Sequence, residues 1–302
     1  MKLFFICILL LLSGCGSPDS DGSSAQDPSL PPRTTVTEFL LPSADGTDVY
    51  GNDFVSIDAS NTSEGYVMVR YTGPADKSRL QMTAPDGTLY SYFLKPGDYQ
   101  TFPLSGGSGS YHLEIYEHAY DNKYALAFPR DLEVSLRDEF KPFLYPNQYC
   151  WYTADSEAVK YGMELSDASA SDLNYVEQVY DYVTGTISYD EELAKNIPTD
   201  YIPDIDAVMA SKKGICFDYA SLMAAMLRSQ GIPTKLEVGY SGQAYHAWIS
   251  VYLQETGWVD GIISFDGKDW TLMDPTLAAG NDRASVKKYI GDGSHYTVKY
   301  TY

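Results

Sequence analysis

Three residues of types that could carry out nucleophilic chemistry lie in order within residues 213–276: Cys216, His246 and Asp274. A thiolate is a strong nucleophile, an imidazole can take its proton as a general base, and a carboxylate can hold the imidazole in the correct tautomer. Such a trio attacks an acyl carbon, forms a thioester and passes the acyl group to an amine or to water. The sequence therefore predicts thiol-dependent acyl chemistry, provided that the fold brings the three side chains together.

The cysteine opens a segment with helical periodicity. Apolar residues recur at i, i+3, i+4, i+7 and i+8 over residues 219–227, and Gly231 followed by Pro233 is a helix stop signal. This pattern places Cys216 in the first turn of a buried helix. Free backbone N–H groups and the positive end of the helix dipole favour the thiolate there, which is the reactive form.

The residues around the cysteine suggest further roles. Gly214 leaves the backbone before the sulfur open, so that a substrate carbonyl could approach closely. The backbone N–H of Cys216 is the candidate oxyanion donor, because amides at a helix start point toward that position. Asp218 is expected to accept hydrogen bonds from N–H groups of the first turn, which is a structural role.

The other two residues are predicted to lie on strands. Residues 246–253 alternate between two faces, which places His246 and Trp248 on the same face. Asp274 belongs to a later predicted strand that ends at Pro275. Trp248 could form a wall of the cleft, or it could pack in the core.

Each of these residues also has a structural interpretation. A single cysteine at a helix start is usually a small buried apolar residue, and an Asp-Pro-Thr sequence is an ordinary turn. A zinc site built from the same trio would be an alternative. The sequence has no paired Cys-x-x-Cys or His-x-x-x-His spacing, so we expect no metal, and nothing in it indicates a cofactor.

The motifs around the trio resemble those of the transglutaminase-like superfamily, a branch of the papain-like cysteine hydrolase fold. The matching segments are Gly214-x-Cys216-x-Asp218-Tyr219-Ala220, Gly231-Ile232-Pro233, Val238-Gly239-Tyr240, His246-Ala247-Trp248 and Asp274-Pro275-Thr276. The resemblance covers roughly residues 174–279. It implies that Cys216 is the nucleophile, His246 the general base and Asp274 the residue that orients the imidazole. The acidic loops that bind calcium in some members have no match here.

The beginning of the chain predicts export. An apolar run over residues 3–12 precedes Leu12-Ser13-Gly14-Cys15, which resembles the lipobox of bacterial lipoproteins. The resemblance implies cleavage before Cys15 and lipidation of its thiol; a plain signal peptide or an uncleaved anchor are the alternatives. Residues 1–15 are then a lipoprotein signal peptide, and the polar residues 16–33 form a disordered tether. We expect an extracytoplasmic protein, anchored by lipid to the bacterial cell membrane.

Composition excludes one class of partner. The chain has 21 Lys plus Arg against 41 Asp plus Glu, a formal net charge of −20. Such an acidic surface is unsuited to nucleic acid, whose phosphates need cations. The expected partners are a protein or peptide substrate and, through the lipid anchor, the membrane.

The remaining residues predict two domains of an α+β protein. Residues 34–137 contain alternating segments separated by turn signals and no helical period, which is typical of an antiparallel β-sandwich. The partner of that sandwich is not indicated. Residues 138–302 form the papain-like, transglutaminase-like domain that follows it. Cys150 is expected to be free and buried between the domains, since a bond to Cys216 would disable the nucleophile.

Helix signals precede the cysteine as well. Ser171 and Asp172 offer caps for one helix, and Asp204 for a second, shorter one. The family resemblance implies that the first of these packs behind the helix of Cys216.

Three functions are compatible with the sequence. The first is acyl transfer or hydrolysis on protein or peptide amides. The second is a cell-wall or peptide cysteine peptidase, and the third is a surface binding module that keeps the fold without turnover. A triad alone does not distinguish an amine acceptor from water, because acceptor choice depends on how the cleft excludes water.

Overall fold

A computed structural model describes residues 33–241, 243–254, 256–259 and 296–302, together with the backbone of 263–265 and 270–272. The chain divides after Pro31, and the unit that begins at Pro32 contains every described residue. The predicted signal peptide and almost all of the predicted tether, residues 16–33, lie outside the described residues. Cys15, Asp274 and Pro275 lie outside them too.

Residues 49–134 form two four-stranded antiparallel sheets. One has the order β1-β2-β3-β6, made of β1 (Val49–Gly51), β2 (Val55–Asp58), β3 (Tyr66–Tyr71) and β6 (Gln100–Pro103). The other has the order β5-β4-β7-β8, made of β4 (Ser78–Thr83), β5 (Leu89–Leu94), β7 (Gly109–Tyr120) and β8 (Lys123–Val134). A short 3-10 helix, η1 (Thr62–Glu64), precedes β3.

The alternation of the strands decides which side chains enter the core. In β4 every second residue is buried, beginning with Ser78, whereas the residues between them are half-buried. Leu80 of one sheet and Ile57 of the other belong to the same buried cluster. The Gly-rich connection over residues 105–110 resembles a hairpin turn in sequence, but it joins β6 to β7, which lie in different sheets.

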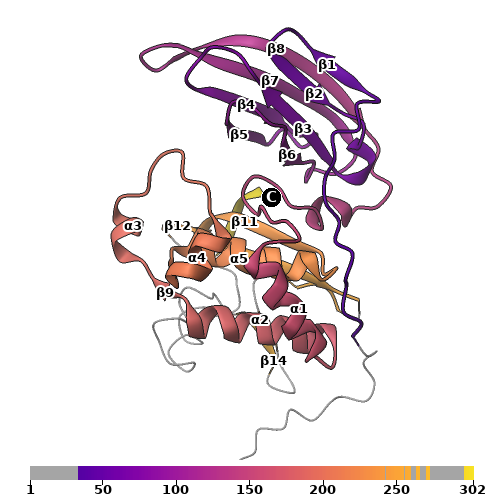
Figure 1. Ribbon diagram of the computed structural model, residues 1–302, viewed down its shortest axis with the longest axis vertical. Helices are drawn as coiled ribbons and strands as arrows, with labels where there is room; N and C mark the ends of the chain where they lie inside the picture. Colours follow the sequence, from indigo (N-terminus) through magenta and orange to yellow (C-terminus); the bar gives the residue numbers. More distant parts are fainter. Residues whose placement is uncertain (1–32, 242, 255, 260–262, 266–269, 273–295) are drawn as a thin grey trace, which may run out of the picture. The chain divides into compact units, whose positions relative to one another are not determined.

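Helices dominate the segment from 157 to 229. They are α1 (Glu157–Asp167), α2 (Asp172–Thr186), α3 (Glu191–Lys195), α4 (Ile205–Ser211) and α5 (Cys216–Ser229), after the 3-10 helix η2 (Lys141–Phe143). The short strands β9 (Ser188–Tyr189) and β10 (Lys213–Gly214) pair in parallel. Helices α1, α2 and α4 all contact α5, which lies at the centre of this group (Figure 1).

The remaining strands form a second antiparallel region. A four-stranded sheet has the order β13-β12-β11-β16, made of β11 (Thr234–Ser241), β12 (Ala244–Leu253), β13 (Gly257–Val259) and β16 (Tyr296–Thr301). Helix α5 packs against β11 and β12 of this sheet. The backbones of β14 (Ile263–Phe265) and β15 (Trp270–Leu272) pair with each other as a separate ladder.

The predicted helix starts are confirmed. The Ser171 hydroxyl accepts a hydrogen bond of 3.2 Å from the backbone N–H of Asn174, and the Asp204 carboxylate accepts one of 3.0 Å from Ala207. Helix α2 packs on α5, as the family resemblance implies, and the Tyr175 hydroxyl donates a bond of 2.8 Å to the backbone oxygen of Met226. The mixture of helices and antiparallel sheets agrees with the predicted α+β class.

One buried apolar cluster contains residues from both predicted domains, whose boundary is at residue 137. It includes Leu80 and Tyr92 from the early sheets, Cys150 and Tyr152 from the connecting segment, and Leu222 from α5. The two predicted domains therefore share a continuous apolar core.

Arg33, the last residue of the predicted tether, is anchored. Its guanidinium pairs with Asp172, donates a bond of 2.8 Å to the Ser166 hydroxyl, and lies 4.2 Å from the ring centroid of Tyr175. Its side chain is only 2% exposed. The folded part therefore begins by Arg33.

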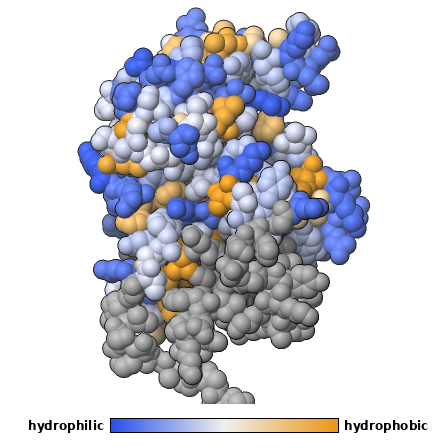
Figure 2. Space-filling model, turned by 180° about the vertical axis from the view of Figure 1, so that it is seen from behind, coloured by the Kyte–Doolittle hydropathy of each residue, from blue (hydrophilic) through white to orange (hydrophobic). Residues whose placement is uncertain are grey.

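The face of the described residues drawn in Figure 2 is predominantly polar. The face in Figure 2 carries hydrophobic side chains as scattered patches among hydrophilic ones. Within the described residues, no helix has the length and apolar character needed to cross a bilayer.

Candidate active site

The first turn of α5 positions the thiol. Ile215 has extended backbone dihedrals (φ −99°, ψ 177°) and precedes Cys216, the first helical residue, which is half-buried. The backbone N–H of Ile215 donates a hydrogen bond of 2.8 Å to a carboxylate oxygen of Asp218. The predicted structural role of Asp218 as a cap is therefore confirmed, and this bond fixes the chain just before the sulfur.

The absence of a side chain at Gly214 leaves space for the side chain of Asp218. A Cβ at Gly214 would lie 2.7 Å from the Cβ of Asp218, closer than side-chain carbons approach each other. The absence of a side chain at Gly214 therefore accommodates Asp218, in addition to any benefit to an incoming substrate.

Tyr201 supports Asp218 from the opposite side. Its hydroxyl donates a bond of 2.6 Å to the second carboxylate oxygen of Asp218. Burial raises the pKa of the Asp218 carboxyl despite its two hydrogen bonds, and burial likewise raises the pKa of the Tyr201 hydroxyl. Tyr201 lies in the loop before α4, where no periodic signal in the sequence predicts a role for it.

His246 lies on β12, where it pairs with Gly239 of β11. Its ring is half-buried and stacks on Trp248 at 6.3 Å between centroids, so the two side chains share a face as predicted. Trp248 is only 3% exposed and packs edge-to-face against Tyr296 at 5.0 Å. Its surroundings are thus those of a core residue that supports the imidazole.

Cys216 and His246 line the same cavity. This cavity has a volume of about 400 Å³, within the range of small-ligand pockets, about 300–1,000 Å³. Ile215, Tyr201 and Ala247 also line it, whereas Gly214 and Trp248 are not among its described lining residues. The thiol and the imidazole therefore face a common space, reached from the start of α5 and from β12.

Aromatic rings form much of the cavity wall. Tyr149, Phe217, Tyr245, Tyr300 and Tyr302 all line it. The rings of Tyr149 and Phe217 lie 5.3 Å apart, and those of Tyr149 and Tyr302 lie 4.6 Å apart. Such a wall suits a chain-like substrate with apolar and amide groups.

The third predicted member of the triad, Asp274, lies outside the described residues. The backbone of β15 ends at Leu272, two positions before it, and pairs with β14 from Ile263↔Leu272 to Phe265↔Trp270. Its role remains a prediction.

Cys150 is separated from the site. It is completely buried, and its thiol donates to the backbone oxygen of Ser221 at 3.6 Å. Burial raises the pKa of this thiol to about 11. Cys150 and Cys216 are both free, which confirms that Cys150 is a free, buried cysteine.

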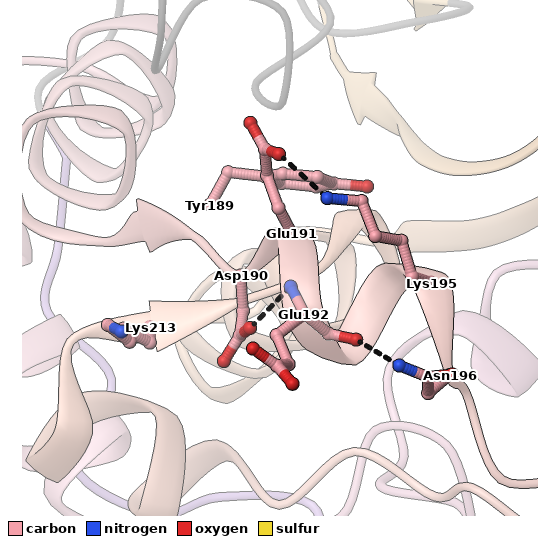
Figure 3. A pocket seen from close by; sticks show the side chains of 7 residues that line it. All are labelled: Tyr189, Asp190, Glu191, Glu192, Lys195, Asn196 and Lys213. Atoms are coloured by element: carbon pink, nitrogen blue, oxygen red, sulfur yellow. Dashed lines mark hydrogen bonds and ion pairs between the residues drawn. The ribbon is translucent and has the colours of Figure 1, made fainter.

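A second hollow, of about 450 Å³, lies around α3 (Figure 3). It is lined by Tyr189, Asp190, Glu191, Glu192, Lys195, Asn196 and Lys213. Asp190 caps α3, and Glu191 forms an ion pair of 3.3 Å with Lys195 that is open to solvent. None of its described lining residues is a cysteine or histidine, so we place no thiol chemistry there. Across the described residues, no group of His, Cys, Asp and Glu side chains is arranged to hold a metal ion.

Comparison with known proteins gives a family for part of the chain. Residues 160–261 match the model of the family described as the transglutaminase-like superfamily. The match includes α5 and β12 and therefore both Cys216 and His246. The resemblance predicted from the sequence is confirmed over this part of the chain.

The individual relatives are more distant. YebA of Bacillus subtilis, an uncharacterized protein, is 30% identical over 106 residues, which cover 28% of this chain and 14% of that protein. A solved structure from Cytophaga hutchinsonii, provisionally described as a cysteine protease, is 14% identical with a TM-score of 0.36, covering 70% of this chain and 74% of that one. Red sea bream transglutaminase is 12% identical with a TM-score of 0.29, covering 70% of this chain and 48% of that one.

Cys216 at the start of α5 and His246 line one cavity, and both lie in the segment that matches this family. The segment resembles thiol-dependent hydrolases and acyltransferases.

Proposed function

We propose that this protein transfers or hydrolyses the acyl groups of protein or peptide amides through a Cys216–His246–Asp274 triad. The observation that carries the proposal is that Cys216 and His246 line one cavity of about 400 Å³. The family match over residues 160–261 supports the same chemistry.

The reaction has two halves. His246 takes the thiol proton, and the sulfur of Cys216 forms a bond to the amide carbonyl carbon; the C–N bond breaks, and the amine leaves with the proton from the imidazolium. Water or an amine then attacks the thioester, loses a proton to His246 and releases the thiol. The backbone N–H of Cys216, at the start of α5, would stabilise the oxyanion. Asp274 would hold the imidazole in the required tautomer.

The proposal also includes the location and domains of the protein. Lipidation of Cys15 would anchor it to the outer face of the membrane, with residues 16–33 as a tether. Residues 34–137 would be a β-sandwich, and residues 138–302 the transglutaminase-like domain. Two antiparallel four-stranded sheets over residues 49–134 support that division.

The deciding experiment is a panel of soluble peptides assayed for two products. Ammonia release would report reaction at a glutamine side chain, and new N-termini would report peptide-bond cleavage, so the panel separates transfer or deamidation from peptidase activity. A Cys216→Ala variant should lose all turnover, and a matched Cys150→Ala variant should retain it. Activity that persists in Cys216→Ala would refute the mechanism, and a cellular effect unchanged by that substitution would favour a binding module.

A further inference from the structure

The cavity that holds Cys216 is not built by the transglutaminase-like segment alone. Arg79 of β4 and Ser91 and Phe93 of β5 also line it. These strands precede residue 160, where the family match begins. The early sheet therefore supplies part of the substrate wall.

The strand register explains why these three side chains act together. Arg79 pairs with Phe93, and Gln81 pairs with Ser91 in the antiparallel β4–β5 ladder. Side chains on one face of a strand recur every second residue. Since Leu80 and Met82 enter the core, Arg79 is directed to the opposite face of β4, where it is half-buried.

The charge of Arg79 is unusual in its setting. The chain carries a formal charge of −20, yet none of the described residues that line this cavity is Asp or Glu. Arg79 is the one lysine or arginine among them. An anion in this cavity would meet a cation and would meet no carboxylate from the described lining.

Within the described residues, aromatic rings contact the Arg79 guanidinium and its Nε makes no hydrogen bond. The guanidinium lies 4.8 Å from the ring centroid of Phe93 and 4.7 Å from that of Tyr124. Its Nε is buried and has no hydrogen-bond partner in the described part of the protein. Burying an N–H group without a hydrogen-bond acceptor is unfavourable. Because Arg79 lines the cavity, an acceptor on a ligand bound there would satisfy this group.

Nearby carboxylates do not neutralise it. Arg79 also borders an adjoining hollow that contains Asp76, Asp121 and Asp200. Asp76 instead pairs with His118 at 2.9 Å. Among the ion pairs formed by the described residues, none involves Arg79.

We propose that Arg79 forms a subsite for a carboxylate of the acyl substrate, so that the preferred substrate is an acidic peptide. This inference rests on the proposed function of Cys216 in the same cavity. A planar guanidinium held against aromatic rings matches a carboxylate bidentately. The carboxylate could be an acidic side chain or a free peptide C-terminus.

One test needs no turnover. Iodoacetate and iodoacetamide alkylate the same thiol, but only the first carries a carboxylate. The ratio of their rate constants at Cys216 should fall about fivefold or more in Arg79→Gln, since an attraction between unit charges in a partly buried site is lost. Arg130→Gln is the matched control: Arg130 lies on β8 of the same sheet, stacks 3.4 Å from the ring centroid of Tyr50, and also has a buried, unpaired Nε. It does not line this cavity, so its ratio should equal that of the wild type.

A second measurement uses the wild-type protein alone and is unaffected by folding of a variant. N-acetylglutamate should protect Cys216 from iodoacetamide at lower concentrations than the neutral N-acetylglutamine amide. An unchanged alkylation ratio in Arg79→Gln, an equal fall in Arg130→Gln, or equal protection by the two compounds would each overturn the subsite.

The peptide assay then identifies the source of the carboxylate. Three peptides would share one reactive residue: a neutral amidated peptide, an amidated peptide with one adjacent glutamate, and a neutral peptide with a free C-terminus. Arg79→Gln should lower kcat/KM about 10- to 100-fold for whichever acidic peptide is preferred and leave the neutral one unchanged. An equal loss on all three peptides would refute the specificity role. If no peptide reacts while the alkylation ratio still depends on Arg79, then the carboxylate subsite stands and the proposed acyl chemistry fails.

Discussion

Arg228 links the helix of the nucleophile to three other segments of the chain. Its side chain is 2% exposed near the end of α5. The guanidinium donates hydrogen bonds of 2.8 and 2.6 Å to the backbone oxygen of Thr234, 3.0 Å to that of Tyr145 and 2.6 Å to that of Tyr302. We predict that Arg228→Met destabilises the protein substantially.

The magnitude follows from the acceptors that stay behind. Methionine fills similar volume but donates no hydrogen bond, so the backbone oxygens of Thr234, Tyr145 and Tyr302 lose charge-assisted donors. The Tyr302 oxygen keeps a bond of 3.0 Å from the backbone N–H of Leu236, so at most two of the three are left unsatisfied. A buried polar group left unsatisfied costs about 1–3 kcal/mol, and the recovered hydration of the cation offsets part of that total. The net loss in the free energy of unfolding should be about 2–4 kcal/mol, from two buried acceptors left without a donor.

Urea unfolding, followed by tryptophan fluorescence and by far-UV circular dichroism, would measure this loss. Arg137→Met is the matched control, because the Arg137 side chain is 76% exposed and, among the described residues, forms an ion pair with Glu64 alone. A surface ion pair contributes about 0–1 kcal/mol, so this variant should stay close to the wild type. If Arg228→Met also lies within about 1 kcal/mol of the wild type, the reasoning from unsatisfied acceptors is wrong.

Three further predictions concern neighbouring parts of the structure. Burial raises the pKa of Cys150 to about 11, so iodoacetamide near pH 8 should label Cys216 in the folded protein and both thiols only in urea, as mass spectrometry would show; labelling of native Cys150 would contradict this burial. Arg33→Ala should lower the free energy of unfolding by about 1–3 kcal/mol, because it removes a buried guanidinium that pairs with the half-exposed Asp172 and bonds the Ser166 hydroxyl. An unchanged urea midpoint would show that these contacts are dispensable. Burial raises the pKa of the Asp218 carboxyl in the folded state, so its contribution to stability is fully present below its unfolded pKa and is lost as the pH rises through its folded pKa. The urea midpoint should therefore fall less across that pH range in Asp218→Asn than in the wild type. A steeper fall in the variant would contradict this sign.

Local signals made much of the site predictable. The helical period after Cys216 and the Gly231 stop predict α5 almost to the residue, and the alternation after His246 predicts β12. The start and stop signals carried these predictions more than a one-sided pattern, because every residue of 218–229 and of 247–251 is buried. The same reasoning identified Asp218 as a cap.

Contacts between distant segments left no such signature. Arg79 reaches the cavity of Cys216 from a strand far away in the chain, and Tyr201 reaches Asp218 from a loop. An arginine on an alternating strand predicts only a solvent-facing position, because periodicity says nothing about what covers that face. Nothing in the sequence pattern of the early strands therefore predicts that they line the cavity of Cys216.

The packing of Tyr302 holds strand β5, which lines part of the cavity, in a fixed position. Its ring lies 5.7 Å from Tyr90 and 5.9 Å from Tyr92, both on β5, and 4.6 Å from Tyr149. Its backbone oxygen accepts a bond from Arg228 of α5. Close-packed cores resist small displacements, since side chains interdigitate with few voids. The strand that carries Ser91 and Phe93 is therefore held against the helix of the nucleophile, and selection of substrate by this wall would depend on its side chains more than on movement between the two parts.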